Sequence, residues 1–173
     1  MPNRIEKVAS EAMGAVKATK AKVEGLSGVF SQLAREHGEV TALLLRGKAS
    51  SDPKVRAELW PKIREELLSH ETGERTVVYP AFREKTELSL FAAEHDREAD
   101  ELERRINELT MTAYDVDLWP TRFGELVDLI TKHVKEEESE YFPAASKAFG
   151  RERSEELLRQ YETAKASSKS HLH

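Results

Sequence analysis

HETGERTVVYPA at residues 70–81 and HVKEEESEYFPA at residues 133–144 are two copies of one pattern, and this pattern is the strongest indication of the fold. Each copy begins with a histidine, has a glutamate four residues later, and closes on an aromatic residue followed by Pro-Ala. A Leu-Trp-Pro sequence also precedes each histidine, at residues 59–61 and 118–120. The chain is therefore interpreted as two copies of one helical hairpin.

The segments upstream of the two copies match as well, because a Glu-His pair occurs at residues 36–37 and again at 94–95. Around each of these four histidines, large apolar residues recur every three or four positions, which places them on one helical stripe with the histidine. Short polar segments separate the stripes, so we predict an all-α fold, an antiparallel up-down-up-down four-helix bundle with extra N- and C-terminal helices. The four bundle helices are expected at about 26–46, from after Asp52 to about Pro80, at about 86–111, and up to about 149.

The pattern also divides the chain into three parts. Residues 1–23 form a predicted appended helix that is rich in Ala and Lys, and residues 24–149 hold the bundle. Gly150 ends the fourth helix, and residues 150–173 give a last amphipathic helix and a frayed tail. These terminal helices are the parts that we expect a second copy or a protein partner to use.

Composition narrows the class of protein. Of the 173 residues, 34 % are charged and 39 % hydrophobic, with only eight Gly and six Pro, a mixture that favours helices over sheets. The absence of cysteine excludes disulfides, iron–sulfur clusters and thiol catalysis. A net charge of −5 argues against unspecific nucleic-acid binding, and neither a membrane-spanning run nor a signal peptide is visible. We expect a soluble cytoplasmic protein.

The His-x3-Glu spacing predicts a metal site. A spacing of four places the two side chains on adjacent turns of one helix face, roughly 6 Å apart, so one cation can contact both. Four buried histidines and two buried carboxylates would be costly unless something satisfied them. Nitrogen and oxygen donors without sulfur suit iron or manganese, while zinc and copper stay open. The six predicted ligands are His37, His70, Glu74, His95, His133 and Glu137.

Some neighbours of these ligands are weaker candidates. Glu71 and Glu138 each follow a predicted ligand by one position, about 100° around the helix, so by default they are solvated or support a ligand, and each could add a metal ligand by swinging inward. Glu94 is expected to be solvated or supporting. Tyr141 lies two turns beyond His133, and we expect its hydroxyl to donate to a bound species. Tyr79 is interpreted as a packing residue.

The order H…HxxxE…H…HxxxE over residues 26–148 resembles the hemerythrin-like family, also called the HHE cation-binding domain. The resemblance implies a non-haem di-iron centre that meets O2, peroxide or nitric oxide, with Glu74 and Glu137 as bridging carboxylates.

The chain departs from the O2-carrying members of that family in two places. Those proteins have two histidines four residues apart on the third helix, whereas Phe91 and Ala99 stand on either side of His95 here. They also place the last carboxylate at the position of Glu138, while the repeat favours Glu137. Fewer imidazoles and more carboxylates favour the ferric state. We therefore favour peroxide breakdown, response to oxidants or nitric oxide, or iron handling over reversible O2 carriage.

Three classes of function remain open at this point. The first is a redox-active di-iron protein, with any chemistry belonging to the metals, because no nucleophile–base pair is visible. The second is an iron- or oxygen-sensing module in which occupancy changes the stability of the bundle. The third is a structural bundle with a buried polar network.

Overall fold

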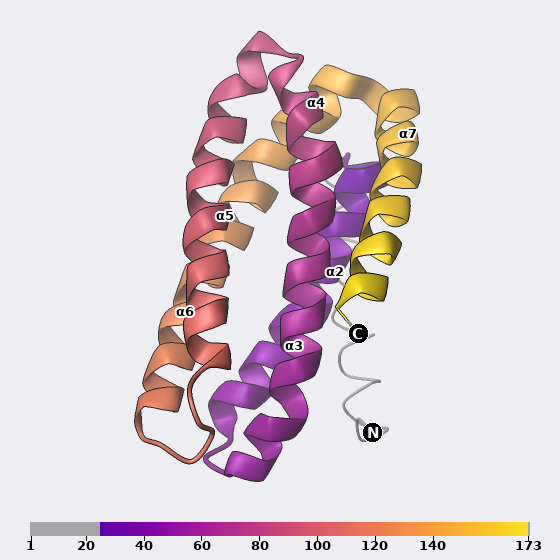
Figure 1. The fold of residues 1–173 in the computed structure, drawn as a ribbon. Coiled ribbons are helices and arrows are strands. Elements are labelled where there is room, and N and C mark those ends of the chain that lie inside the picture. Colours follow the sequence, from indigo (N-terminus) through magenta and orange to yellow (C-terminus); the bar gives the residue numbers. More distant parts are fainter. Residues whose placement is uncertain (1–24, 173) are drawn as a thin grey trace.

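The computed structural model describes residues 25–172, and in this part of the chain all regular secondary structure is helical, without strands (Figure 1). The all-α prediction is confirmed, whereas the up-down-up-down order and the extra terminal helices stay predictions. The helix predicted at residues 1–23 lies outside the described residues. The elements are α2 (Gly28–Ala49), α3 (Pro53–Gly73), η1 (Glu74–Val78), α4 (Tyr79–Arg83), η2 (Thr86–Leu88), α5 (Ser89–Thr110), α6 (Leu118–Glu136), η3 (Glu137–Tyr141) and α7 (Phe142–His171).

Local sequence explains where α3 begins and where α7 is divided. The Asp52 carboxylate accepts a 2.9 Å hydrogen bond from the backbone N–H of Lys54 and so caps the start of α3. Gly150 has φ 72° and ψ 176°, a conformation that only glycine adopts readily, and it divides α7 into two helical segments. The expected end near Pro80 is wrong, because α4 continues to Arg83.

Each copy of the repeat contains a wider helical turn that explains this continuation. η1 and η3 are π-helical, and their hydrogen bonds run from the N–H of Tyr79 to the carbonyl of Glu74 and from Phe142 to Glu137. A proline ring normally clashes with the carbonyl four residues back. A π-turn just before the proline changes that register, so the helix continues past it. Such turns are rare and are often found at functional sites.

Two apolar clusters fill the interior. One lies against α4 and the start of α7 and includes Phe30, Tyr79, Phe82 and Phe142. The other includes Trp60, Leu67, Ile106, Trp119 and Leu126 from α3, α5 and α6. The side chains of His37, Glu74, His95, His133 and Glu137 belong to neither cluster, although they are buried.

The second segment of α7 folds back along the bundle, beside α2 and α3 (Figure 1). A Cβ atom on Gly28 would lie 2.2 Å from the backbone carbonyl of Ser154, so only glycine permits this contact. Ser154, Leu157 and Tyr161 are buried. This segment is therefore an integral layer of the described fold.

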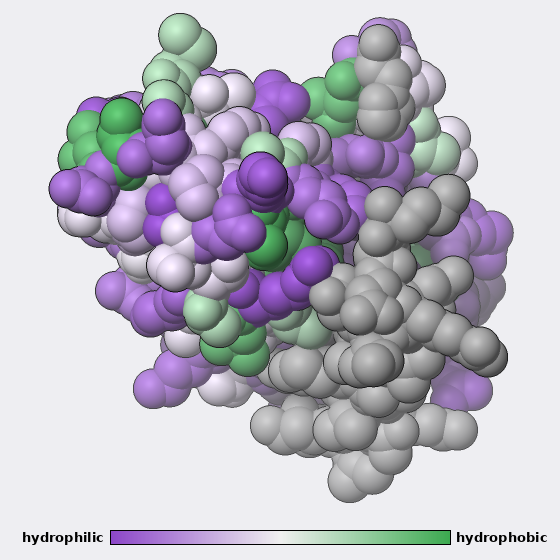
Figure 2. Space-filling model, turned by 90° about the horizontal axis from the view of Figure 1, so that it is seen from below, coloured by the Kyte–Doolittle hydropathy of each residue, from purple (hydrophilic) through white to green (hydrophobic). Residues whose placement is uncertain are grey.

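The end of the molecule with the α2–α3 and α5–α6 connections is mostly hydrophilic on its visible surface, with separate small apolar areas (Figure 2). Met111, Val116 and Leu118 are exposed hydrophobic residues at the α5–α6 connection. Among the described helices, none is both long and apolar enough to cross a membrane.

Candidate metal centre

The six predicted ligands come together in the middle of the bundle. α2, α3, α5 and α6 each supply one histidine, and the two π-turns each begin with a glutamate. All six side chains are at most 16 % exposed, and those of Glu74, His95 and Glu137 are fully buried. They form two groups that share their carboxylates.

The first group lies between α2 and α3. His37, His70 and Glu74 bring one ligand atom each within 4.8 Å of the others. Nε2 of His70 is 3.3 Å from Oε1 of Glu74, and Nε2 of His37 is 3.2 Å from Oε2 of Glu137. Two imidazoles and two carboxylates therefore face one point.

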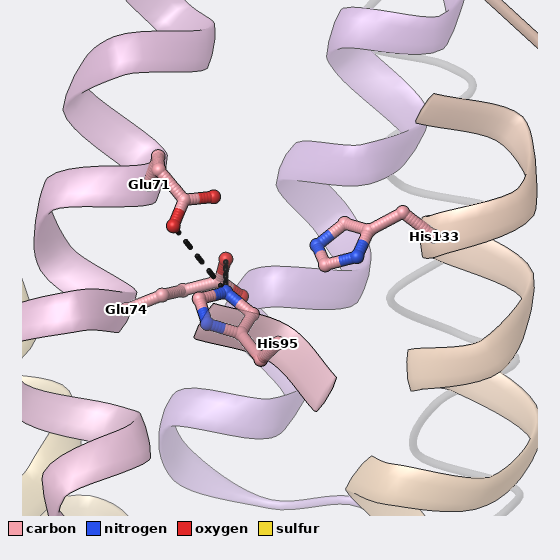
Figure 3. A group of neighbouring side chains, drawn as sticks. All are labelled: Glu71, Glu74, His95 and His133. Carbon is pink, nitrogen blue, oxygen red and sulfur yellow. Dashed lines mark hydrogen bonds and ion pairs between the residues drawn. The ribbon is translucent and has the colours of Figure 1, made fainter. Parts of the chain in front are cut away.

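The second group lies between α3, α5 and α6 (Figure 3). Glu71, Glu74, His95 and His133 again offer ligand atoms within 4.8 Å of one another. Nε2 of His95 is 3.4 Å from both Oε1 of Glu71 and Oε2 of Glu74. Nε2 of His133 is 3.4 Å from Oε1 of Glu137. Glu71, a weaker candidate from sequence, thus stands inside the cluster.

Glu74 and Glu137 connect the two groups. The two oxygens of Glu74 face His70 and His95, and those of Glu137 face His133 and His37. Each carboxylate thus contacts one histidine of the first helical hairpin and one histidine of the second. This is the arrangement that carboxylates bridging two metals require in a helical bundle.

The polar atoms that face the two points have ion-pair neighbours at 3.2–3.4 Å but lack well-formed hydrogen bonds. Five of them are buried without any hydrogen bond: Nε2 of His70, Nε2 of His133, Oε1 of Glu71, Oε1 of Glu74 and Oε2 of Glu137. Buried polar groups are normally hydrogen-bonded, and each unsatisfied one costs about 1–3 kcal/mol. A cation in each group would satisfy these atoms, so the residues present fit a metal pair.

Outer carboxylates hold three of the four imidazoles from behind. The Nδ1 atom of His70 lies 2.8 Å from Glu36, that of His133 lies 2.8 Å from Glu98, and that of His37 lies 3.1 Å from Glu138. Such contacts fix the proton on Nδ1 and leave Nε2 free to bind a metal. The structure thus places Glu138 behind His37.

His95 is held differently. Its Nδ1 is buried without a hydrogen bond, and its ring stacks on Tyr79 with 3.6 Å between centroids. The corresponding aromatic residue of the second copy, Phe142, stacks on His37 at 5.7 Å. The aromatic residue of each copy therefore packs on a histidine of the other half, namely the one that has no glutamate four residues later.

Three tyrosine hydroxyls donate to glutamates around the centre. Tyr79 donates to Oε1 of Glu137, and Tyr161 donates to Oε2 of Glu36 at 2.6 Å. Tyr141 donates to Glu94 at 2.9 Å. Sequence reasoning missed the supporting positions of Glu36, Glu98 and Tyr161, and it interpreted Tyr79 as packing only. The Glu-His pair at residues 36–37 was the one available signal.

Charge within the cluster outweighs the effect of burial for most groups. Burial lowers the pKa of His70, but Glu74 and Glu36 raise it well above the ordinary value. Burial raises the pKa of Glu74, but His70 and His95 hold it well below its usual range. Glu71 differs, since burial raises its pKa to about 7 although His95 opposes the shift. Without a metal, imidazolium protons balance the carboxylates, and a cation would replace those protons.

A cavity of about 170 Å³ lies beside the cluster. It contacts ligand candidates from both groups, and most of its other lining is aliphatic. Small concave sites with a few polar groups on apolar walls are the usual form of ligand pockets. The lining includes His37, His70, Glu71 and His133 together with Val40, Leu43, Leu67, Leu102, Ile130 and Val134.

Known proteins resemble this chain over most of its length. The hemerythrin HHE cation-binding domain matches residues 28–145. A DNA nickase from Nostoc sp. (strain PCC 7120 / SAG 25.82 / UTEX 2576) is 25 % identical over 142 residues, which cover 79 % of this chain but 39 % of the nickase. No solved structure matches the chain. The family match covers most of the chain and every residue of the two groups, and the chain therefore belongs to the hemerythrin HHE cation-binding family.

Proposed function

We propose that the cluster binds two iron ions, one on the His37 and His70 side and one on the His95 and His133 side. Glu74 and Glu137 bridge the two sites, and Glu71 adds a carboxylate to the second. The observation that carries this proposal is the sharing of both buried glutamates between histidines of opposite halves. Nitrogen and oxygen donors without sulfur suit iron, with manganese or zinc as alternatives.

The chemistry at this centre is proposed to involve O2, peroxide or nitric oxide. Iron supplies the redox change and the binding position, while the chain orients the ligands and limits access. The aliphatic part of the cavity suits a small, weakly polar molecule, and charged side chains such as Glu36, Glu66 and Lys165 complete its lining. Tyr79 keeps a hydroxyl donor against Glu137, one of the two shared carboxylates.

Reversible O2 carriage is the less favoured form of this function. Ala99 and Phe91 stand where O2 carriers have a further histidine, and Phe91 stacks on Tyr141. Glu71 instead brings a third carboxylate into the cluster. A more anionic ligand set stabilises ferric iron. Peroxide breakdown, in which two H2O2 give O2 and two H2O, or a sensing role fits this set better.

One experiment tests the metal centre. The purified protein is loaded anaerobically with Fe(II), its iron is counted, and visible spectra are recorded before and after adding peroxide, azide or nitric oxide. We expect two irons per chain, and fewer in His70→Ala and His133→Ala. The matched control is His171→Ala, which changes an exposed histidine of α7. Wild-type protein that binds no iron and melts unchanged with Fe(II) would refute the proposal.

The same samples separate turnover from sensing. Sustained O2 release from peroxide, lost with the iron, indicates an enzyme. A large change in melting temperature on oxidation without turnover favours the alternative, an iron- or oxygen-sensing module, because a ligand that binds only the folded state stabilises it. The matched relative is named a DNA nickase, but this chain covers 39 % of it, so we assign nicking to that protein alone.

A further inference from the structure

The second segment of α7 reaches the His70 side of the centre. Tyr161 is fully buried, and its hydroxyl donates to Oε2 of Glu36 at 2.6 Å and lies 3.1 Å from Nδ1 of His70. Nζ of Lys165, one turn further along α7, is 2.9 Å from the same oxygen of Glu36. Tyr161 and Lys165 lie beyond residues 28–145, so they are additions to the matched domain.

The first copy of the repeat makes room for this tyrosine. A Cβ atom on Gly73 would lie 2.4 Å from Cε2 of Tyr161 and 2.6 Å from Cδ2. Gly73 has ordinary helical angles, φ −62° and ψ −41°, so its backbone does not require glycine. The second copy has Glu136 at the corresponding position. The glycine between Thr72 and Glu74 is therefore explained by the Tyr161 ring.

The other half lacks an equivalent support among the described contacts. Glu98, which holds Nδ1 of His133, has Lys132 as its cationic partner. The Lys132 side chain is 61 % exposed, whereas that of Lys165 is 14 % exposed. Glu36 also accepts a 2.9 Å hydrogen bond from Gln32 on its other oxygen. Both oxygens of Glu36 thus accept from donors, and two of these donors come from α7. Glu98 is held by an exposed lysine.

We propose that Tyr161 is a positioning residue that makes the two metal sites unequal, and this inference rests on the proposed function. Tyr161 fixes Glu36 against His70, which keeps the proton of His70 on Nδ1 and aims Nε2 at the metal. Such outer contacts commonly change metal affinity by about 10–100-fold. Tyr161 therefore raises the affinity for the metal on the His70 side and not for the metal on the His133 side.

The test compares Tyr161→Phe with Tyr114→Phe, which removes a hydroxyl from the α5–α6 connection. Anaerobic calorimetric titration with Fe(II) measures both equivalents. In Tyr161→Phe we expect one equivalent to weaken about 10–100-fold while the other stays as in the wild type, and Tyr114→Phe to change neither. If Tyr161→Phe does not fold, Glu36→Gln replaces it and must weaken the same equivalent.

Metal-free protein provides a second measurement. The 15N chemical shifts of the His70 ring should change in Tyr161→Phe while those of the His133 ring stay constant, because the Tyr161 hydroxyl lies beside Nδ1 of His70 and not beside His133. Unchanged affinities, equal weakening of both equivalents, or unchanged His70 shifts would overturn this inference and leave the proposed function intact. Wild-type protein without iron binding would instead overturn both.

Discussion

The two copies of the repeat supply the same ligands at the same spacing, yet their surroundings differ. His70 is held by Glu36, which a buried tyrosine and a nearly buried lysine contact from α7. His133 is held by Glu98, whose lysine is exposed. The difference shows that the repeat fixes which atoms meet the metals, while residues outside it decide how firmly each half is held.

The largest expected effect concerns the residues that both halves share. Glu74→Gln and Glu137→Gln should each lower iron binding at both sites, since each carboxylate faces one histidine of either half. We expect fewer than one iron per chain, measured by metal analysis after gel filtration, against one in His70→Ala or His133→Ala. The control is Glu140→Gln, an exposed glutamate in the same π-turn as Glu137. Loss of only one iron in Glu74→Gln would show that this carboxylate does not bridge.

The inner cluster was largely predictable from sequence, because it depends on local spacing. A His-x3-Glu on one helix face brings both groups to one side whatever the rest of the chain does. Glu71 was harder, because it lies about 100° from His70 on the helix and enters the cluster only where α5 brings His95 to that side. The position of Glu71 in the cluster depends on which faces of α3 other helices cover. Other helices cover both the His70 face and the Glu71 face.

The supporting residues could not be predicted, because their contacts are distant in sequence. Tyr161 and Glu36 are 125 positions apart, and no periodicity relates them. The π-turns were also missed, since the pattern predicts a helix without specifying the register of its hydrogen bonds. Glu98 is not in register with Glu36, whose counterpart in the second half, Glu94, contacts Tyr141 instead. Internal symmetry therefore fails as a guide beyond the ligands.

The second prediction exploits the glycine that only the first copy has. Gly73→Ala should destabilise the metal-free protein by about 3 kcal/mol, because the new methyl group overlaps the buried Tyr161 ring and forces it to move. In an unobstructed helix the same change stabilises by up to about 1 kcal/mol. Gly124→Ala in α6 is the matched control, since nothing lies within 4 Å of the position that its new methyl group would take. Urea unfolding measures both, and a stabilised Gly73→Ala variant would contradict the close packing of Tyr161.

A smaller effect is expected where the aromatic residues of the two copies differ. Tyr79 donates to Glu137, whereas its counterpart Phe142 has no hydroxyl to offer Glu74. Tyr79→Phe keeps the ring stacked on His95 but removes this donor, so we expect a loss of about 2 kcal/mol in metal-free stability. The iron-loaded visible spectrum should also shift, because a ligand carboxylate loses a hydrogen bond. A variant with both spectrum and stability unchanged would show that the hydroxyl does not act on Glu137.

The smallest expected effects distinguish the two lysines. Lys165→Ala removes a nearly buried partner of Glu36 and should cost about 1 kcal/mol of metal-free stability, while Lys132→Ala should cost less than about 0.5 kcal/mol, because its side chain is 61 % exposed. Salt sharpens the contrast, since the Debye length falls to about 3 Å at 1 M ionic strength and screens exposed pairs far more than buried ones. The Lys132→Ala effect should therefore disappear at an ionic strength of about 1 M, and most of the Lys165→Ala effect should persist. Urea unfolding at low and high salt measures both variants. Equal costs with equal salt dependence would mean that the two outer carboxylates are held alike, and that the asymmetry of the two halves rests on Tyr161 alone.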